Sequence, residues 1–240
     1  MIARVRELHR RLRRDEGFTI IEMIVVVAIL GVVLAMVQQT TIMAQKDVSA
    51  NSSRLDQLQQ SKVAMDSLSK ILRTSVLPTQ LEGSCPTCDD AAFITGDSRS
   101  VSFYANINND SNVIGPSQVS YTLATTGATA GDLTEYIHGP NPHAATDHNY
   151  QYTCTVATAG CVVRSRVLAH HVDTTQAVFT YYDASGAVIT PPLNVTTLPL
   201  VDSIDVVIKV KASKFVPAVT LTERVTLPNA DAVANESASS

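Results

Sequence analysis

A run of twenty residues with a single charge constrains this chain more than any other feature. The run extends from Phe18 to Val37, and Glu22 is its only ionisable side chain. A helix of that length measures roughly 30 Å, which matches the hydrocarbon core of a bilayer. A helix that is apolar on every side is rarely the core helix of a chain this size. We therefore expect a transmembrane helix.

Charge is distributed unevenly on the two sides of this run. The whole chain has 18 Lys and Arg against 22 Asp and Glu, a net charge of −4. Residues 1–17 contain six arginines and three carboxylates, or +3, which leaves −7 for residues 18–240. The positive-inside rule keeps the arginine-rich segment in the cytoplasm and places everything after Val37 outside it. The acidic body, which has no Trp, argues against nucleic-acid binding.

The residues just before the apolar run differ from a secretory signal peptide, in which the small residues at the cleavage site follow the apolar core. Here Gly17 precedes it. The string RRDEG, then FTIIE, resembles the class III signal of type IV prepilins and type II secretion pseudopilins. The resemblance implies that a prepilin peptidase cuts after Gly17, that Phe18 becomes a methylated N-terminus, and that Glu22 is the fifth mature residue.

Glu22 is also unusual on physical grounds. A carboxylate in a membrane helix costs roughly 2.5–3.5 kcal/mol on insertion scales, so it marks a functional site with a partner. Cleavage after Gly17 would supply that partner, the α-amino group of Phe18, either in the same helix or in a neighbouring subunit of a filament. Alternatively, Glu22 lies near enough to the interface to reach water and has no role in assembly.

Neither Gly nor Pro occurs between Gly31 and Pro78, so we expect one helix over residues 18–77. Its first third spans the membrane, and an apolar stripe on its second half packs against the protein's own head. A break into two helices near residues 49–53 remains open, because Ser and Asn compete for backbone hydrogen bonds. The proposed stripe consists of Leu55, Leu58, Met65, Leu68 and Leu72.

Residues 78–228 show short β-type segments between turn signals, and we expect an antiparallel, β-rich head outside the cytoplasm. We therefore expect an α+β fold with residues 229–240 as a disordered tail. The resemblance implies that this fold is pilin-like and that residues 1–17 are a removable leader. A hairpin is expected at 178–189, turning at Asp183–Gly186. The expected strands are 101–104, 119–123, 150–156, 162–168, 204–211 and 219–227. The YYDASG and SIDVVIKV segments resemble the heads of PilW-like minor pilins and J-type minor pseudopilins.

Four cysteines lie in the expected head, namely Cys85, Cys88, Cys154 and Cys161. An even number outside the cytoplasm favours two disulfides. We expect the local pairs Cys85–Cys88 and Cys154–Cys161, with cross-pairing as the alternative. A catalytic role for the C-x-x-C spacing is disfavoured, because Asp89 and Asp90 would not lower a thiol pKa. The six-residue gap of the second pair is poor zinc-finger spacing.

Two polar loops have the residue types of metal sites but poor spacing. His138, His143 and His148 recur every five residues, with Asp147 alongside, and we interpret them as an exposed loop. Asn106, Asn108, Asp110 and Asn112 have calcium-loop spacing without its Gly and Glu, so a turn is expected, although some pseudopilin heads bind calcium. We expect no catalytic residues, no resident metal and no cofactor, since the usual enzyme motifs are missing.

The resemblance implies a minor pilin or pseudopilin that helps to prime or cap a type IV pilus or a type II secretion-like filament. Its partners would be a prepilin peptidase, other major and minor pilins, and the membrane platform of the assembly machine. It would lie in the cytoplasmic membrane before entering an extracytoplasmic filament. The alternatives are an uncleaved, membrane-anchored binding or adhesion protein, and a competence pseudopilin that captures DNA through Arg164 and Arg166.

Overall fold

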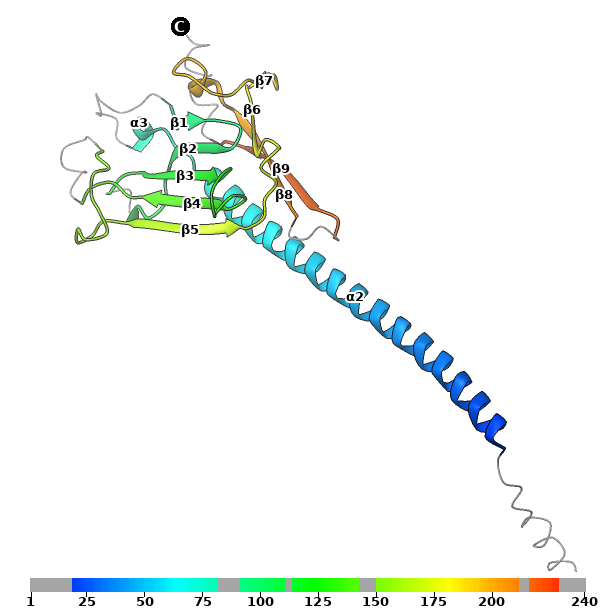
Figure 1. Cartoon of the computed structure of the whole chain (residues 1–240). Helices are drawn as coiled ribbons and strands as arrows, with labels where there is room; N and C mark the ends of the chain where they lie inside the picture. The colour runs from blue at the N-terminus through cyan, green and yellow to red at the C-terminus, as the bar shows by residue number, and fades with distance from the viewer. Residues whose placement is uncertain (1–18, 82–90, 111–113, 143–149, 212–215, 229–240) are drawn as a thin grey trace, which may run out of the picture. The chain divides into compact units, whose positions relative to one another are not determined.

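The computed structural model describes residues 19–81, 91–110, 114–142, 150–211 and 216–228 (Figure 1). A long N-terminal apolar helix is followed by antiparallel β-sheets, which confirms the α+β, pilin-like architecture. Contacts within the chain divide it into two units between Asn51 and Ser52.

Helix α2 extends from Ile20 to Leu72 and contains 53 residues. It includes residues 49–53, so the alternative of two helices is wrong. It ends five residues before the expected Leu77, because the backbone after it pairs with the end of a strand. The Val76 amide donates to the carbonyl of Tyr104 at 3.0 Å, and Asn106 donates to Thr74 at 2.9 Å. A short helix, α3, follows over Pro78–Leu81.

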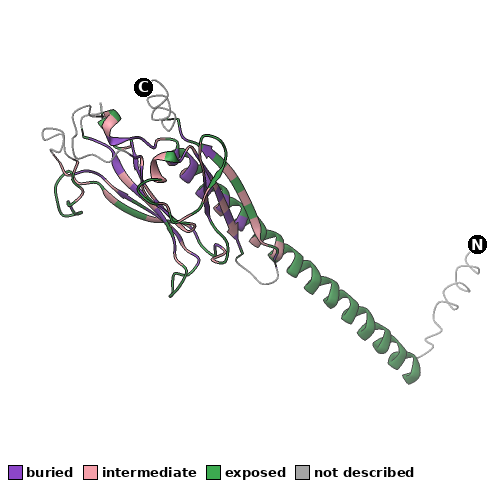
Figure 2. Ribbon diagram, turned by 90° about the horizontal axis from the view of Figure 1, so that it is seen from above, coloured by how far each residue is buried: buried purple, intermediate pink, exposed green. Residues whose placement is uncertain are grey.

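The buried face of α2 lies within residues 57–72 and differs from the expected stripe. Met65, Leu68 and Leu72 are buried, but Leu55 and Leu58 are exposed. At about 100° per residue, Leu55 lies far around the helix from Leu68, so the two cannot share one face. Small or polar side chains occupy the first turns of the buried face instead: Gln57, Ser61 and Ala64. Figure 2 shows burial confined to this end of the helix.

The first sheet, sheet A, has five antiparallel strands in the order β1-β2-β3-β4-β5. Three of its strands were expected from sequence, whereas β1 and β4 were not. In the register of β4 with β5, Glu135 lies opposite Arg166 and His138 opposite Val163. The strand bounds are β1 Phe93–Gly96, β2 Ser100–Ala105, β3 Ser117–Leu123, β4 Leu133–His138 and β5 Val163–Ala169.

The second sheet, sheet B, has four antiparallel strands in the order β7-β6-β8-β9. The expected hairpin is confirmed, since the carboxylate of Asp183 accepts from the amides of Ser185 and Ala187 at 2.9 Å and Gly186 has a φ of 80°. The strand bounds are β6 Phe179–Tyr182, β7 Val188–Ile189, β8 Ser203–Val210 and β9 Val219–Thr226. A 3-10 helix, η3, covers Leu198–Leu200.

The expected strand at 150–156 is wrong, because its described backbone forms no ladder with either sheet. Asn141 accounts for this difference. Its side-chain oxygen accepts from the amides of Thr153 and Cys154, and its backbone amide donates to Gln151. Hydrogen bonds to one side chain thus replace those of a strand neighbour.

One apolar core joins the end of α2 to the inner faces of both sheets. Phe103 and Tyr121 of sheet A and Tyr181 and Ile204 of sheet B are essentially fully buried in the same cluster as Leu68. An isolated bridge between Val172 and Val210 adds a backbone contact between the chain after β5 and the end of β8. Residues 52–240 therefore contain one apolar core, and the loops described below connect strands that pack on it.

Candidate functional site

The first turn of α2 holds the one candidate assembly residue that the structure describes. Glu22 lies three residues after Thr19, whose hydroxyl oxygen accepts a hydrogen bond from the Glu22 amide at 3.3 Å. The carbonyl of Thr19 also accepts from the amides of Glu22 and Met23. Thr19 is therefore the N-cap residue of the helix, and Thr-x-x-Glu is the spacing of a capping box. Sequence reasoning missed this local role of Glu22, although the spacing was visible.

The processing residues Gly17 and Phe18 lie outside the described residues. Cleavage after Gly17 and pairing of the Phe18 amine with Glu22 therefore stay predictions. The described geometry does put Glu22 in the first turn, where the positive end of the helix dipole favours a carboxylate. An amine one turn before it would add a second favourable charge interaction.

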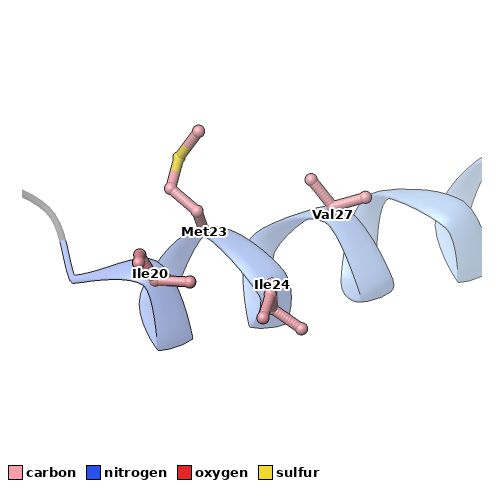
Figure 3. A pocket seen from close by; sticks show the side chains of 4 residues that line it. All are labelled: Ile20, Met23, Ile24 and Val27. Atoms are coloured by element: carbon pink, nitrogen blue, oxygen red, sulfur yellow. The ribbon is translucent and has the colours of Figure 1, made fainter.

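An open apolar groove lies along one face of the same helical segment (Figure 3). It is lined by Ile20, Met23, Ile24 and Val27, which are spaced at three and four residues. At about 100° per residue, Glu22 lies on the opposite side of the helix from this groove. The segment therefore has an apolar face and, across from it, a face with one carboxylate.

Helix α2 is long and apolar enough, by length and composition, to cross a membrane. All of its residues from Ile20 to Ser49 are exposed in the single chain. Exposed apolar side chains over such a length need cover from lipid or from another protein. The helix is consistent with membrane anchoring.

The structure contains a disulfide between Cys154 and Cys161, with their Cα atoms 6.0 Å apart. The other two candidates, Cys85 and Cys88, lie outside the described residues. The bond closes a loop of six residues between the end of the Asn141-bound segment and the start of β5. Because Cys161 lies two residues before β5, the disulfide restrains the backbone where the chain enters that strand.

Of the histidines considered as a metal site, only His138 is described, while His143, His148 and Asp147 lie outside the described residues. His138 ends β4, and its Nε2 lies 2.9 Å from the carbonyl oxygen of Cys154 and 3.8 Å from the sulfur of that residue. Among the described residues, His138, Cys154 and Cys161 are the one group whose ligand atoms gather within 4.8 Å. Sequence spacing missed this cluster, because the pairing of β4 with β5 brings its members together.

The calcium-like loop is organised by a residue outside the expected set. The side-chain oxygen of Asn109 accepts from the backbone amides of Ile114 and Gly115 at 2.9 Å, and its side-chain nitrogen, Nδ2, donates to the side-chain oxygen of Asn106. Asn108 has a φ of 56°, a turn conformation that Asn tolerates. Asn112 lies outside the described residues. The described part of this loop is thus a side-chain-stabilised turn.

The two arginines of the DNA-capture alternative differ in their surroundings. Arg166 pairs with the buried Glu135, Nε to Oε1 at 2.6 Å, and also donates to Ser67 of α2. The hydrogen bond to Glu135 raises the pKa of Arg166. Arg164 is exposed. A phosphate would have to compete with a buried carboxylate for Arg166, so the pair is a poor nucleic-acid patch.

Two comparisons with known proteins bear on these features. Residues 12–37 match the family model for the prokaryotic N-terminal methylation motif. No curated protein matches the chain. The matched segment includes Gly17, Phe18, Glu22 and the apolar part of α2. The chain therefore carries the methylation motif of prepilin-type signals, which supports its place among type IV pilin-like proteins.

Proposed function

We propose that this protein is a minor pilin or pseudopilin, a structural subunit that helps to prime or cap assembly of a type IV pilus or a type II secretion-like filament. The observation that carries the proposal is the methylation motif at residues 12–37, which overlaps the start of a 53-residue helix. The end of the helix belongs to a β-rich unit, residues 52–240, which contains both sheets. Its role is structural, with Phe18 and Glu22 acting in assembly.

The sequence of events follows from this proposal. The chain is first held in the cytoplasmic membrane with its head outside, and a prepilin peptidase removes residues 1–17. The platform of the assembly machine then moves the mature subunit into a filament. Exchange of lipid for neighbouring helices around α2 keeps its apolar groove covered throughout. The Glu22 carboxylate, on the other side of the helix, is free to meet the Phe18 amine of a neighbour.

The experiment that tests the proposal is N-terminal sequencing of the protein recovered from native membranes and from sheared filaments. We expect a start at methylated Phe18 in both fractions. A start at Met1 in cells with an active prepilin peptidase would contradict the proposal and favour the uncleaved binding protein.

A matched pair of variants separates processing from assembly. Glu22→Ala and Glu22→Gln should both be cleaved normally but enter filaments poorly, because each removes the charge that pairs with the amine. Gln38→Ala, an exposed polar position of the same helix, should assemble like the parent. Equal incorporation of all three variants would remove Glu22 from the assembly mechanism and leave only its place in the capping box.

A further inference from the structure

The cluster of His138, Cys154 and Cys161 has the chemistry of a soft metal site. Two thiolates and an imidazole are the ligands that zinc prefers, and three protein ligands leave a fourth tetrahedral position for water. Cys154 is buried, while His138 and Cys161 are partly exposed, so an ion has a route from solvent. In the disulfide form the sulfurs carry no thiolate charge and are poor ligands.

Distances within the cluster already approach those around zinc. Zn–S bonds of 2.3 Å and Zn–N bonds near 2.0 Å, at tetrahedral angles, separate N from S by about 3.6 Å. The His138 Nε2 lies 3.8 Å from the Cys154 sulfur. On reduction, the sulfurs need to move only to about 3.8 Å apart to share a zinc ion. Rotation about the Cα–Cβ bonds provides that movement while both backbones stay in place.

The backbone on each side of the cluster is held by bonds other than the disulfide. The Cys154 amide donates to the side chain of Asn141 at 2.8 Å. The Cys161 amide donates to Thr158 at 3.0 Å, and Gly139, next to His138, donates to Val162 at 2.7 Å. Opening the S–S bond therefore leaves the three ligand residues near one another. Because the ligand residues are already held in place, less conformational entropy is lost when the ion binds.

The His138 ring is positioned between two tyrosines. Its centroid lies 6.0 Å from that of Tyr136 and 6.1 Å from that of Tyr152, and both pairs are edge-to-face. Its Nε2 lies nearer to the carbonyl oxygen of Cys154, at 2.9 Å, than to the sulfur of that residue, at 3.8 Å. With the ring proton on Nδ1, Nε2 carries a lone pair, and a turn of the ring away from the Cys154 carbonyl would direct that lone pair at the sulfurs.

We propose that the dithiol form of this protein binds one zinc ion through His138, Cys154 and Cys161. A dithiol reductant first breaks the S–S bond, which gives two thiols and leaves the reductant as its own disulfide. Zinc then displaces one proton from each thiol and forms two Zn–S bonds and one Zn–N bond. The head thus has two alternative closed states of the same loop, one with a disulfide and one with zinc.

The test uses the full chain in detergent micelles with Cys85→Ser and Cys88→Ser, so that only one cysteine pair remains. Zinc alone is added without oxygen, in competition with a chromophoric chelator, to protein reduced with a phosphine. We expect one zinc per chain after reduction and none in the oxidised sample. Absence of zinc from the reduced chain would overturn the proposal.

Variants decide whether His138 is a ligand. His138→Gln should weaken zinc binding by about tenfold or more. His170→Gln is the matched control, because His170 pairs with Asp132 and lies outside the cluster. Cobalt substitution adds an independent signal, since tetrahedral thiolate ligation gives charge-transfer and d–d bands. Equal affinity of the His138→Gln variant and the parent would contradict the three-ligand site, and circular dichroism checks that each variant is folded.

Discussion

The guanidinium of Arg166 and the carboxylate of Glu135 face each other across strands β5 and β4, with Nε 2.6 Å from Oε1. A second nitrogen of Arg166 lies 3.1 Å from Oε2, and the hydroxyl of Tyr121 donates to that same oxygen. Arg166 also reaches Ser67 on α2. The buried Glu135 carboxylate on β4 therefore bonds to side chains from β3 and β5, and Arg166 connects this group to α2.

Removing Arg166 should destabilise the head. Arg166→Ala leaves the Glu135 carboxylate buried without its counter-charge, which we expect to cost about 3 kcal/mol, the low end for a broken buried pair because Arg166 is partly exposed. Arg164→Ala, the exposed neighbour, should change stability by less than about 0.5 kcal/mol. Urea unfolding followed by circular dichroism measures both.

A paired substitution at the same site should restore most of the loss. The double variant Glu135→Leu and Arg166→Met replaces the ion pair by apolar side chains of similar volume, and such exchanges are often neutral. If the double variant is no more stable than Arg166→Ala, the loss comes from the contact with Ser67, from packing or from the Tyr121 hydroxyl left without its acceptor, and the ion-pair account is not supported.

The leucines of α2 should differ sharply in their contribution to stability. Leu68 is fully buried in the core, so Leu68→Ala should cost about 2–5 kcal/mol through the cavity it leaves. Leu55 is 66% exposed, and Leu55→Ala should cost less than about 0.5 kcal/mol. The same urea titration compares the two. A large effect of Leu55→Ala in the single chain would mean that the originally expected stripe is the true packing face.

Acid should weaken the head partly through Asp205. Hydrogen bonds from Arg224 lower the pKa of Asp205 below its ordinary value of 3.8. A carboxylate with a lowered folded-state pKa adds stability that is complete above the unfolded value and is lost as pH falls through the folded value. Stability should therefore decline below about pH 4. Asp205→Asn should decline less steeply over the same interval, and a decline as steep as that of the parent would contradict this role of Asp205.

Alkali should reveal two tyrosines that do not ionise in the folded state. Burial, and then the charge of Glu135, raise the pKa of Tyr121, and burial raises the pKa of Tyr181. A raised tyrosine pKa favours the neutral folded form, so stability is lost as pH rises above the unfolded value near 10. Ultraviolet titration of the seven tyrosines should leave these two un-ionised until the head unfolds. Tyr181→Phe should lower the number of late-titrating tyrosines by one, and an unchanged number would show that Tyr181 is not among the protected ones.

The sequence predicted those elements in which apolar residues face the core and polar or turn residues face solvent, as the local backbone geometry requires. The alternation of Ile204, Val206, Ile208 and Val210 defines β8, and Asp183 with Gly186 defines the turn of the β6–β7 hairpin. Strand β4 was missed because its inward residues include Glu135, a charge that alternation assigns to the outer face. No local sequence pattern indicates that Arg166, thirty-one residues later, forms an ion pair with Glu135.

The candidate site was predictable only where its residues are close in sequence. Gly17, Phe18 and Glu22 form a contiguous motif, and residues 12–37 match its family model. The contact of His138 with Cys154 depends on the pairing of β4 with β5 and on the hydrogen bonds of Asn141, neither of which spacing reveals. Long-range register is the information that a single sequence lacks.

Charged residues on two edge strands affect how copies of this head would interact when they lie close together. Strands β5 and β9 are edge strands, and each directs one charge toward the end of α2 or the residue after it: Arg166, which bonds to Ser67, and Glu223, which pairs with Arg73 at 3.0 Å. An edge that carries an inward-pointing charge resists pairing with a strand of another chain, because the added strand would disturb a satisfied ion. At these two edges, neighbouring copies of the head should therefore resist strand-to-strand pairing when many of them are concentrated on one surface.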